Sequence, residues 1–99
     1  MSKSIKVRVP PDVEELIRNL HPLLKQKVRA GLEEICRDPH CGKALKDELA
    51  GLGSFRIKRF RIIYELSRKG QISIVAIGPR RHIYEETLRI LSRQYKDEQ

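Results

Sequence analysis

Four cationic side chains, Arg56, Lys58, Arg59 and Arg61, stand within six residues of one another in the stretch F-R-I-K-R-F-R-I-I-Y. A guanidinium group can hold two phosphate oxygens at once, so this density of basic groups suits a phosphodiester. In RNA the 2′-OH is a built-in nucleophile. A protein need only align it, take its proton, stabilise the charge at phosphorus and protonate the leaving 5′-oxygen. A basic cluster without metal therefore suffices to cleave RNA, whereas on DNA it could bind but not cleave by this route.

A second polar group follows Gly78-Pro79 and completes the set of candidates: Arg80, Arg81, His82 and Tyr84. Several candidates have a purely structural alternative. Arg56 and Lys58 could be edge charges that block aggregation, Tyr84 could be a core residue at helical spacing, and His82 could be a surface residue at a helix start. Arg61 is different, because an arginine in mid-strand between two apolar residues requires an anionic partner or a ligand.

The net charge is +8, and the excess is concentrated in roughly one quarter of the chain. Residues 56–81 carry a net charge of +7, with one acid and eight basic residues: Glu65 against Arg56, Lys58, Arg59, Arg61, Arg68, Lys69, Arg80 and Arg81. A basic surface alone can simply be solvated. This concentration favours an anionic partner such as RNA, DNA or an acidic protein.

The 99 residues favour a single domain, 1–99, with one modest core. Hydrophobic periodicity predicts a strand at 4–9, helices at 11–20 and 22–37, a short helical or irregular connector at 45–53, two strands within 54–66, a strand at 71–78 and a helix at 82–95. The short link at His21-Pro22 predicts an antiparallel helical hairpin. The order β-α-α-β-β-β-α indicates an α+β fold, with the helical hairpin packed on one face of the sheet and a C-terminal helix.

A tight turn at Lys58-Arg59 decides which way Arg61 points. Without it, one straight strand would mix charged and apolar residues on each face. With it, the second strand turns one set of residues to the core and the other set away: Phe60, Ile62, Tyr64 and Leu66, against Arg61, Ile63 and Glu65. We expect the helices to cover the first face, and Arg61 with the basic turns to occupy the other.

Other chemistries lack their motifs. The chain has no G-x-S-x-G, no phosphate-binding glycine loop and no evident paired carboxylates. Cys36 and Cys41 flank His40 at a spacing that is not a standard zinc pair, so two reduced thiols and no metal are expected. Neither a secretory signal nor a membrane-spanning run is visible, so we expect a cytoplasmic protein without a cofactor and without a membrane partner.

Three runs together resemble a known family. G-x-x-x-x-R-I-x-R-F-R-I-I-Y-E is followed about one strand later by I-G-P-R-R-H-I-Y, and G-K-A-L-K-D-E-L-A-G-L precedes both. They are similar to the RelE/ParE superfamily of toxins from bacterial and archaeal toxin–antitoxin pairs. The resemblance covers the whole chain in element order, with the motifs between residues 42 and 91. It implies a compact α+β fold with an antiparallel sheet, helices on one side and the site on the exposed concave side.

The resemblance also implies residue roles. RelE-like members cleave mRNA in the ribosomal A site without metal and leave a 2′,3′-cyclic phosphate and a 5′-OH. By this resemblance Arg61 grips the scissile phosphate, Arg80 stabilises the transition state, and Tyr84 stacks on a base or helps proton transfer. Arg56 and Lys58 match paired basic residues that bind phosphate and supply a candidate base. The further RNA-binding candidates are Arg59, Arg81 and His82.

The implied partners are a cognate antitoxin, the ribosome and its mRNA, with operator DNA reached only through the antitoxin. Three interpretations stay open. The first is a ribosome-dependent mRNA interferase, favoured by the nearly complete basic set. The second is a ParE-like inhibitor of DNA gyrase without nuclease chemistry. The third is a catalytically inactive homologue that acts with its antitoxin in DNA-bound autoregulation.

Overall fold

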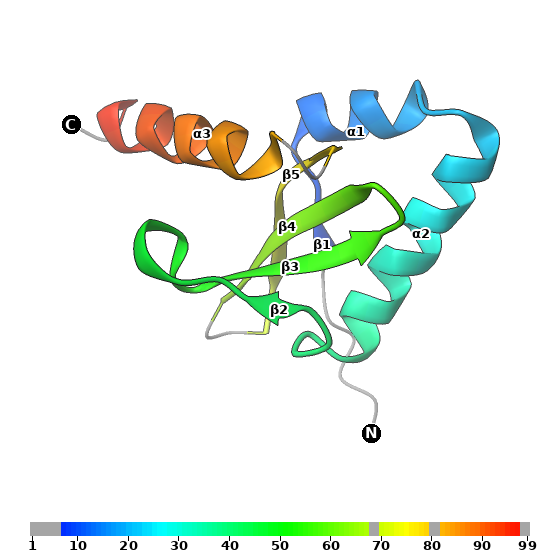
Figure 1. The fold of residues 1–99 in the computed structure, drawn as a ribbon, viewed down its shortest axis with the longest axis horizontal. Coiled ribbons are helices and arrows are strands. Elements are labelled where there is room, and N and C mark those ends of the chain that lie inside the picture. Colours follow the sequence, from blue (N-terminus) through cyan, green and yellow to red (C-terminus); the bar gives the residue numbers. More distant parts are fainter. Residues whose placement is uncertain (1–6, 68–69, 80–81, 98–99) are drawn as a thin grey trace.

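The computed structural model describes residues 7–67, 70–79 and 82–97, and within them three helices pack against a five-stranded sheet (Figure 1). In chain order the elements are β1 (Val7–Arg8), α1 (Pro11–Arg18), α2 (Pro22–Arg37), β2 (Lys43–Ala44), the short 3₁₀ helix η1 (Asp47–Leu49), β3 (Leu52–Ile57), β4 (Phe60–Leu66), β5 (Ile72–Pro79) and α3 (Ile83–Asp97). The predicted α+β class is confirmed. Helix η1 lies within the predicted connector, for which a short helix was one expectation, and strand β2 just before it is an addition.

The strand order is β1-β5-β4-β3-β2, and β5 lies inside the sheet as its apolar sequence indicates. Strands β2 to β5 pair antiparallel, but β1 pairs parallel with β5, with Val7 opposite Ile72. The sheet is therefore mixed, and the expectation of a purely antiparallel sheet needs this correction. The physical reason is the connection: two helices and three strands lie between β1 and β5 in the chain, and such a long crossover allows a parallel pair.

Local sequence explains where the two N-terminal helices begin. Each has a proline in its first turn, where the missing N–H is not needed, and the His21 side chain caps α2 by accepting from the Leu23 N–H at 3.2 Å. The predicted helical hairpin of α1 and α2 is confirmed, and the two helices are in contact. From the link at 19–21, α2 runs down beside the sheet at a steep angle to α1 (Figure 1).

One face of the sheet packs against α1 and α2. Its buried cluster is made of alternate residues of the strands and the inner positions of the two helices: Ile57, Ile62, Tyr64, Ile72, Ile74 and Ile77 with Val13, Val28 and Ile35. Gly31 allows the close approach of α2, since a Cβ there would lie 2.8 Å from Cδ1 of Ile57. The predicted inward set of β4 is confirmed, because Phe60, Ile62, Tyr64 and Leu66 all belong to this layer.

The C-terminal helix α3 packs on the opposite face, so the expectation that helices cover only one face was wrong. A second buried cluster joins Leu52, Ile63 and Ala76 of the sheet to Ile83 at the start of α3. Ile63 lies between Arg61 and Glu65 on this face and is completely buried. An apolar side chain in that position needs a cover, and the amphipathic α3 supplies it.

A register shift between β4 and β5 decides which residues of β5 lie on this second face. Ile63 pairs with Ala76 but the next residue, Tyr64, pairs with Ile74, so Val75 is an extra residue in β5. An extra residue moves the side chains beyond it to the other face. The shift therefore places Gly78 opposite Arg61, on the face that α3 covers.

Candidate functional site

The β3–β4 hairpin brings two arginines face to face. Ile57 pairs with Phe60, which leaves Lys58 and Arg59 as the two turn residues, as the sequence predicts. The next pair, one residue further from the turn, is Arg56 with Arg61. These two side chains therefore emerge from directly opposite positions on one face of the sheet. Opposite residues have Cβ atoms about 4.5–5.5 Å apart, and like charges there destabilise the pair unless an anion lies between them.

Arg61 is the half-buried member of the pair. Its Nη1 donates to the Ser54 hydroxyl at 2.9 Å. Its Nε is buried and has no hydrogen-bond partner among the described residues. A buried donor without a partner costs about 1–3 kcal/mol, and more when the group is charged. An unpaired guanidinium donor inside a basic face is what an anion-binding site requires.

Arg56 and the turn residues form the exposed side of the site. The Arg56 Nε donates to the carbonyl of Lys58 at 3.2 Å. Lys58 has a left-handed backbone with φ of 52°, a conformation that glycine adopts more readily. Arg59 is exposed beside it. The turn therefore accepts some backbone strain and keeps two cationic side chains at the turn end of the hairpin.

Tyr84 comes to the same face from α3. It is half-buried and packs against the second cluster, which includes Ile63, the residue two positions after Arg61 in β4. Gly78 sets the closeness of this helix start, since a Cβ there would lie 3.2 Å from Cδ1 of Ile83. The structure thus places Arg56, Arg61 and Tyr84 on the same side of the sheet, and Tyr84 contributes to the core there.

His82 lines a neighbouring cleft. It is exposed just before α3 and lines a cleft of about 270 Å³ whose other wall includes Asp12 and Leu16 of α1. The predicted residues Arg80 and Arg81 fall outside the described part of the chain. The site around Arg61 lies on the side of the sheet that α3 packs against, and the largely apolar cleft beside His82 reaches Gly78, the residue paired with Arg61.

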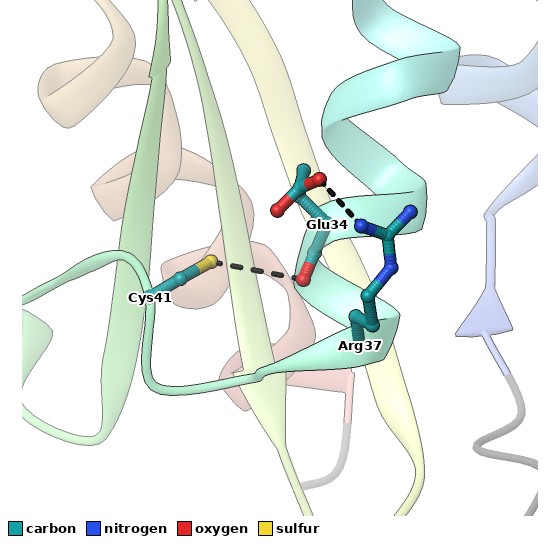
Figure 2. Close-up of polar contacts among 3 residues, drawn as sticks. All are labelled: Glu34, Arg37 and Cys41. Atoms are coloured by element: carbon teal, nitrogen blue, oxygen red, sulfur yellow. Dashed lines mark hydrogen bonds and ion pairs between the residues drawn. The ribbon is translucent and has the colours of Figure 1, made fainter.

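The cysteines do not form a reactive centre. Burial, assisted by Glu33, raises the pKa of the Cys36 thiol; burial, assisted by Asp38 and Glu34, raises that of Cys41. Both thiols therefore stay protonated at neutral pH and are poor nucleophiles. Figure 2 shows the Cys41 thiol directed at the last turn of α2, where it donates to the Glu34 carbonyl at 3.9 Å, while Arg37 pairs with the Glu34 carboxylate at 3.0 Å. No group of three or more His, Cys, Asp or Glu among the described residues is arranged to hold a metal.

Sequence reasoning missed Ser54, which the structure places under the Arg61 guanidinium. A signal was available. Once the turn is placed at Lys58-Arg59, the pairing puts Ser54 opposite Ile63 and hence diagonally across from Arg61 on the same face. A polar residue at a buried register position beside a charged one is a candidate partner.

Comparison with known proteins decides the family. Residues 6–84 match the family model described as the ParE toxin of the type II toxin–antitoxin system parDE. The chain belongs to this toxin family. That match covers most of the toxin chain, and it agrees with the resemblance carried by the R-I-K-R-F-R-I-I-Y and I-G-P-R-R-H-I-Y runs. No curated protein matches the toxin at a significant level.

Solved structures share the fold of this toxin. The RelBE2 toxin–antitoxin complex from Mycobacterium tuberculosis is 25% identical, covers 79% of this chain and 100% of its own matched chain, and has a TM-score of 0.69. A free mutant of the E. coli toxin RelE is 9% identical over 93% and 98% of the two chains, with a TM-score of 0.72. The YoeB-YefM complex from Staphylococcus aureus is 22% identical over 74% and 93%, with a TM-score of 0.60. Among the described residues of the toxin, no helix is both long and apolar enough to cross a membrane.

Proposed function

We propose that this toxin is a ribosome-dependent, metal-independent endoribonuclease that cleaves mRNA in the A site by attack of the 2′-OH. The observation that carries the proposal is the environment of Arg61. Its Nε is a buried donor without a partner, and Arg56 lies directly opposite on a strand of the same basic hairpin. Two guanidinium groups that emerge from opposite positions on one face of the hairpin supply the charge that a phosphorane needs.

The residues divide the work by position. Arg61 holds the scissile phosphate at the floor of the site, and Arg56 and Lys58 bind phosphate from its exposed side, where Lys58 is a candidate base. Tyr84 supplies a ring for base stacking or a hydroxyl for proton transfer. Arg80 stabilises the transition state by its match to the family motif, and Arg59, Arg81 and His82 add RNA contacts around the site. Alignment and charge stabilisation are the main sources of rate in such a site.

A cognate antitoxin is the proposed direct partner. The toxin's fold is shared by chains solved as the RelBE2 and YoeB-YefM complexes. An extended or helical antitoxin segment rich in acidic and apolar residues complements a protein of net charge +8. We propose that this antitoxin segment either covers the Arg61 face or binds next to it and distorts it. Operator DNA is reached through the antitoxin alone, and the toxin acts in the cytoplasm on ribosomes.

A second candidate function is inhibition of DNA gyrase, as in ParE-like toxins. The name of the matched family model, the ParE toxin, favours this alternative. In that case the basic hairpin is a binding surface and performs no chemistry. A catalytically inactive homologue that acts with its antitoxin in autoregulation is the remaining alternative.

Two assays separate these functions with one preparation of protein. The toxin is added to a purified translation reaction and, in parallel, to DNA gyrase supercoiling relaxed plasmid. The proposal expects cuts within translated codons and unimpaired supercoiling. Blocked supercoiling with intact message would establish the gyrase inhibitor instead, and no effect in either assay would indicate the inactive homologue.

A further inference from the structure

We propose that Ser54 is a positioning residue of the Arg61 site, whose hydroxyl holds the Arg61 guanidinium in the orientation that meets a phosphate. The assignment deepens the proposed nuclease function and rests on it for its catalytic consequence. The hold of Ser54 on Arg61 can be measured without any activity.

Ser54 occupies a position that packing alone would give to an apolar residue. It lies in β3 opposite Ile63, and only 2% of its surface is exposed. Its same-face neighbour two residues earlier, Leu52, belongs to the apolar cluster under α3. Burying a hydroxyl is unfavourable unless it is hydrogen-bonded. The Arg61 Nη1 supplies that bond at 2.9 Å, so each of the two polar groups gives the other a hydrogen-bond partner.

The hydrogen bond also sets the direction of the guanidinium. Ser54 lies two residues further from the turn than Arg56, the residue opposite Arg61. The bond therefore draws Arg61 along the strands, away from Arg56 and toward the part of the sheet that α3 covers. Without an acceptor there, like-charge repulsion and hydration favour an outward, mobile arginine.

The bond to Ser54 uses Nη1 of Arg61 and leaves the Nε donor without a hydrogen-bond partner among the described residues. In a guanidinium group, Nε–H and one Nη2–H point to the same side, and that edge can hold two phosphate oxygens in parallel. Ser54 accepts from Nη1, and Nε stays without a partner among the described residues. A guanidinium that one hydrogen bond holds in place while its Nε donor stays unpaired is preorganised for an anion.

The test combines an orientation measurement with cleavage, in wild type and in Ser54→Ala, Ser54→Cys and Ser73→Ala. Cysteine keeps nearly the volume of serine but is a weak acceptor, so Ser54→Cys separates packing from hydrogen bonding. Ser73→Ala is a matched serine change near the far end of the sheet, on β5, where Ser73 pairs with Glu65. Melting temperatures check that every variant is folded.

The orientation is read from the ¹⁵N heteronuclear NOE of the Arg61 Nε in the free protein. We expect this NOE to drop in Ser54→Ala and Ser54→Cys and to stay at its wild-type value in Ser73→Ala. In single-turnover cleavage on ribosomes we expect a loss of about tenfold or more in the rate at saturating enzyme for both Ser54 variants, as for the loss of one hydrogen bond to a charged group. In an Arg61→Ala background, Ser54→Ala should cause no further loss.

An Arg61 Nε NOE that is unchanged in Ser54→Ala, a Ser54→Cys variant with wild-type cleavage, or additive losses in the double variant would each overturn the proposal. A wild type that cuts nothing, together with a reduced NOE in Ser54→Ala, would refute the nuclease function while supporting the hold of Ser54 on Arg61.

Discussion

Arg56 and Arg61 are directly opposite residues of β3 and β4, yet their guanidinium groups donate in opposite directions along the hairpin. Arg56 donates toward the turn, to the Lys58 carbonyl, and Arg61 donates away from it, to the Ser54 hydroxyl. Two like charges that diverge from adjacent backbone positions leave a gap between them that is positive on both sides. An anionic group in this gap would neutralise both arginines at once.

RNA binding by the free protein should therefore depend strongly on salt, and both arginines should contribute. For single strands the slope of log K against log salt concentration changes by about 0.7 for each phosphate contact that is lost. We expect Arg56→Ala and Arg61→Ala each to lower the slope by that amount for a single-stranded RNA oligonucleotide. Arg37→Ala is the control, since Arg37 is paired with Glu34 at the far end of α2. An equal change in the control would show that only overall charge matters.

Tyr84 has two separable roles, because its ring packs against the second cluster while its hydroxyl belongs to a half-buried side chain on the Arg61 face. Tyr84→Phe keeps the ring. If the hydroxyl transfers a proton, this variant should lose about 10²–10⁴-fold in cleavage rate without a change in melting temperature. A Tyr84→Phe variant with wild-type cleavage would assign Tyr84 to stacking and packing, and Tyr84→Ala would then lower both activity and stability.

Tyr64 anchors the loop after α2, so we expect its hydroxyl to contribute to the free energy of unfolding. Its hydroxyl donates to the Pro39 carbonyl at 2.7 Å and accepts from the Gly42 N–H at 3.2 Å. Tyr64→Phe leaves both backbone groups without this partner, and we expect a loss of about 1–3 kcal/mol in urea unfolding at neutral pH. A loss below a few tenths of a kcal/mol would mean that water replaces the hydroxyl.

The same residue gives a pH dependence with a definite sign. Burial raises the pKa of Tyr64 above its ordinary value, although the hydrogen bond from Gly42 partly opposes the shift. A raised folded-state pKa means that the unfolded state loses its proton first, so the stabilisation is complete below pH of about 10 and is lost as pH rises through the folded-state value. The stability difference between wild type and Tyr64→Phe should shrink above about pH 10. A difference that grows with pH would contradict this environment.

The thiols offer an independent check on the C-terminal end of α2 and the loop after it. Because burial raises the pKa of both Cys36 and Cys41, their alkylation by iodoacetamide near neutral pH should be slower in the folded protein than in urea. The variant Cys41→Ser leaves Cys36 as the reacting thiol, so a comparison with wild type assigns one alkylation rate to each cysteine. A thiol that reacts faster in the folded protein would reveal a site that stabilises the thiolate, which this arrangement of Glu33, Glu34 and Asp38 does not provide.

Much of the site geometry could be predicted from the alternation of β4. The conflict between charged and apolar residues in 54–66 is resolved only by a turn at Lys58-Arg59, and the structure has that turn. The bounds of α2 were equally predictable, since proline starts the helix at Pro22 and Asp38-Pro39 ends it. These features depend on local sequence, and local rules are enough for them.

The placement of α3 was not predictable in the same way. An amphipathic helix can cover either face of a sheet, and the choice here depends on Ile63, Leu52 and Ala76 sharing a face with Arg61. Ala76 and Gly78 lie on that face because of the extra residue Val75, which a strict alternation along β5 does not reveal. The parallel pairing of β1 is likewise a property of the whole chain path and of no single segment.

The most direct test of the account is primer extension on a message translated in a purified reaction, with wild type, Arg61→Ala and the control Arg37→Ala. We predict cuts inside translated codons with wild type and Arg37→Ala, and a loss of about 10²–10³ in cutting with Arg61→Ala, the scale of losing one preorganised charge-stabilising donor. Circular dichroism should show that Arg61→Ala is folded. Cuts that persist at the wild-type rate in a folded Arg61→Ala would contradict the central role given to Arg61, and no cuts from the wild type would contradict the nuclease itself.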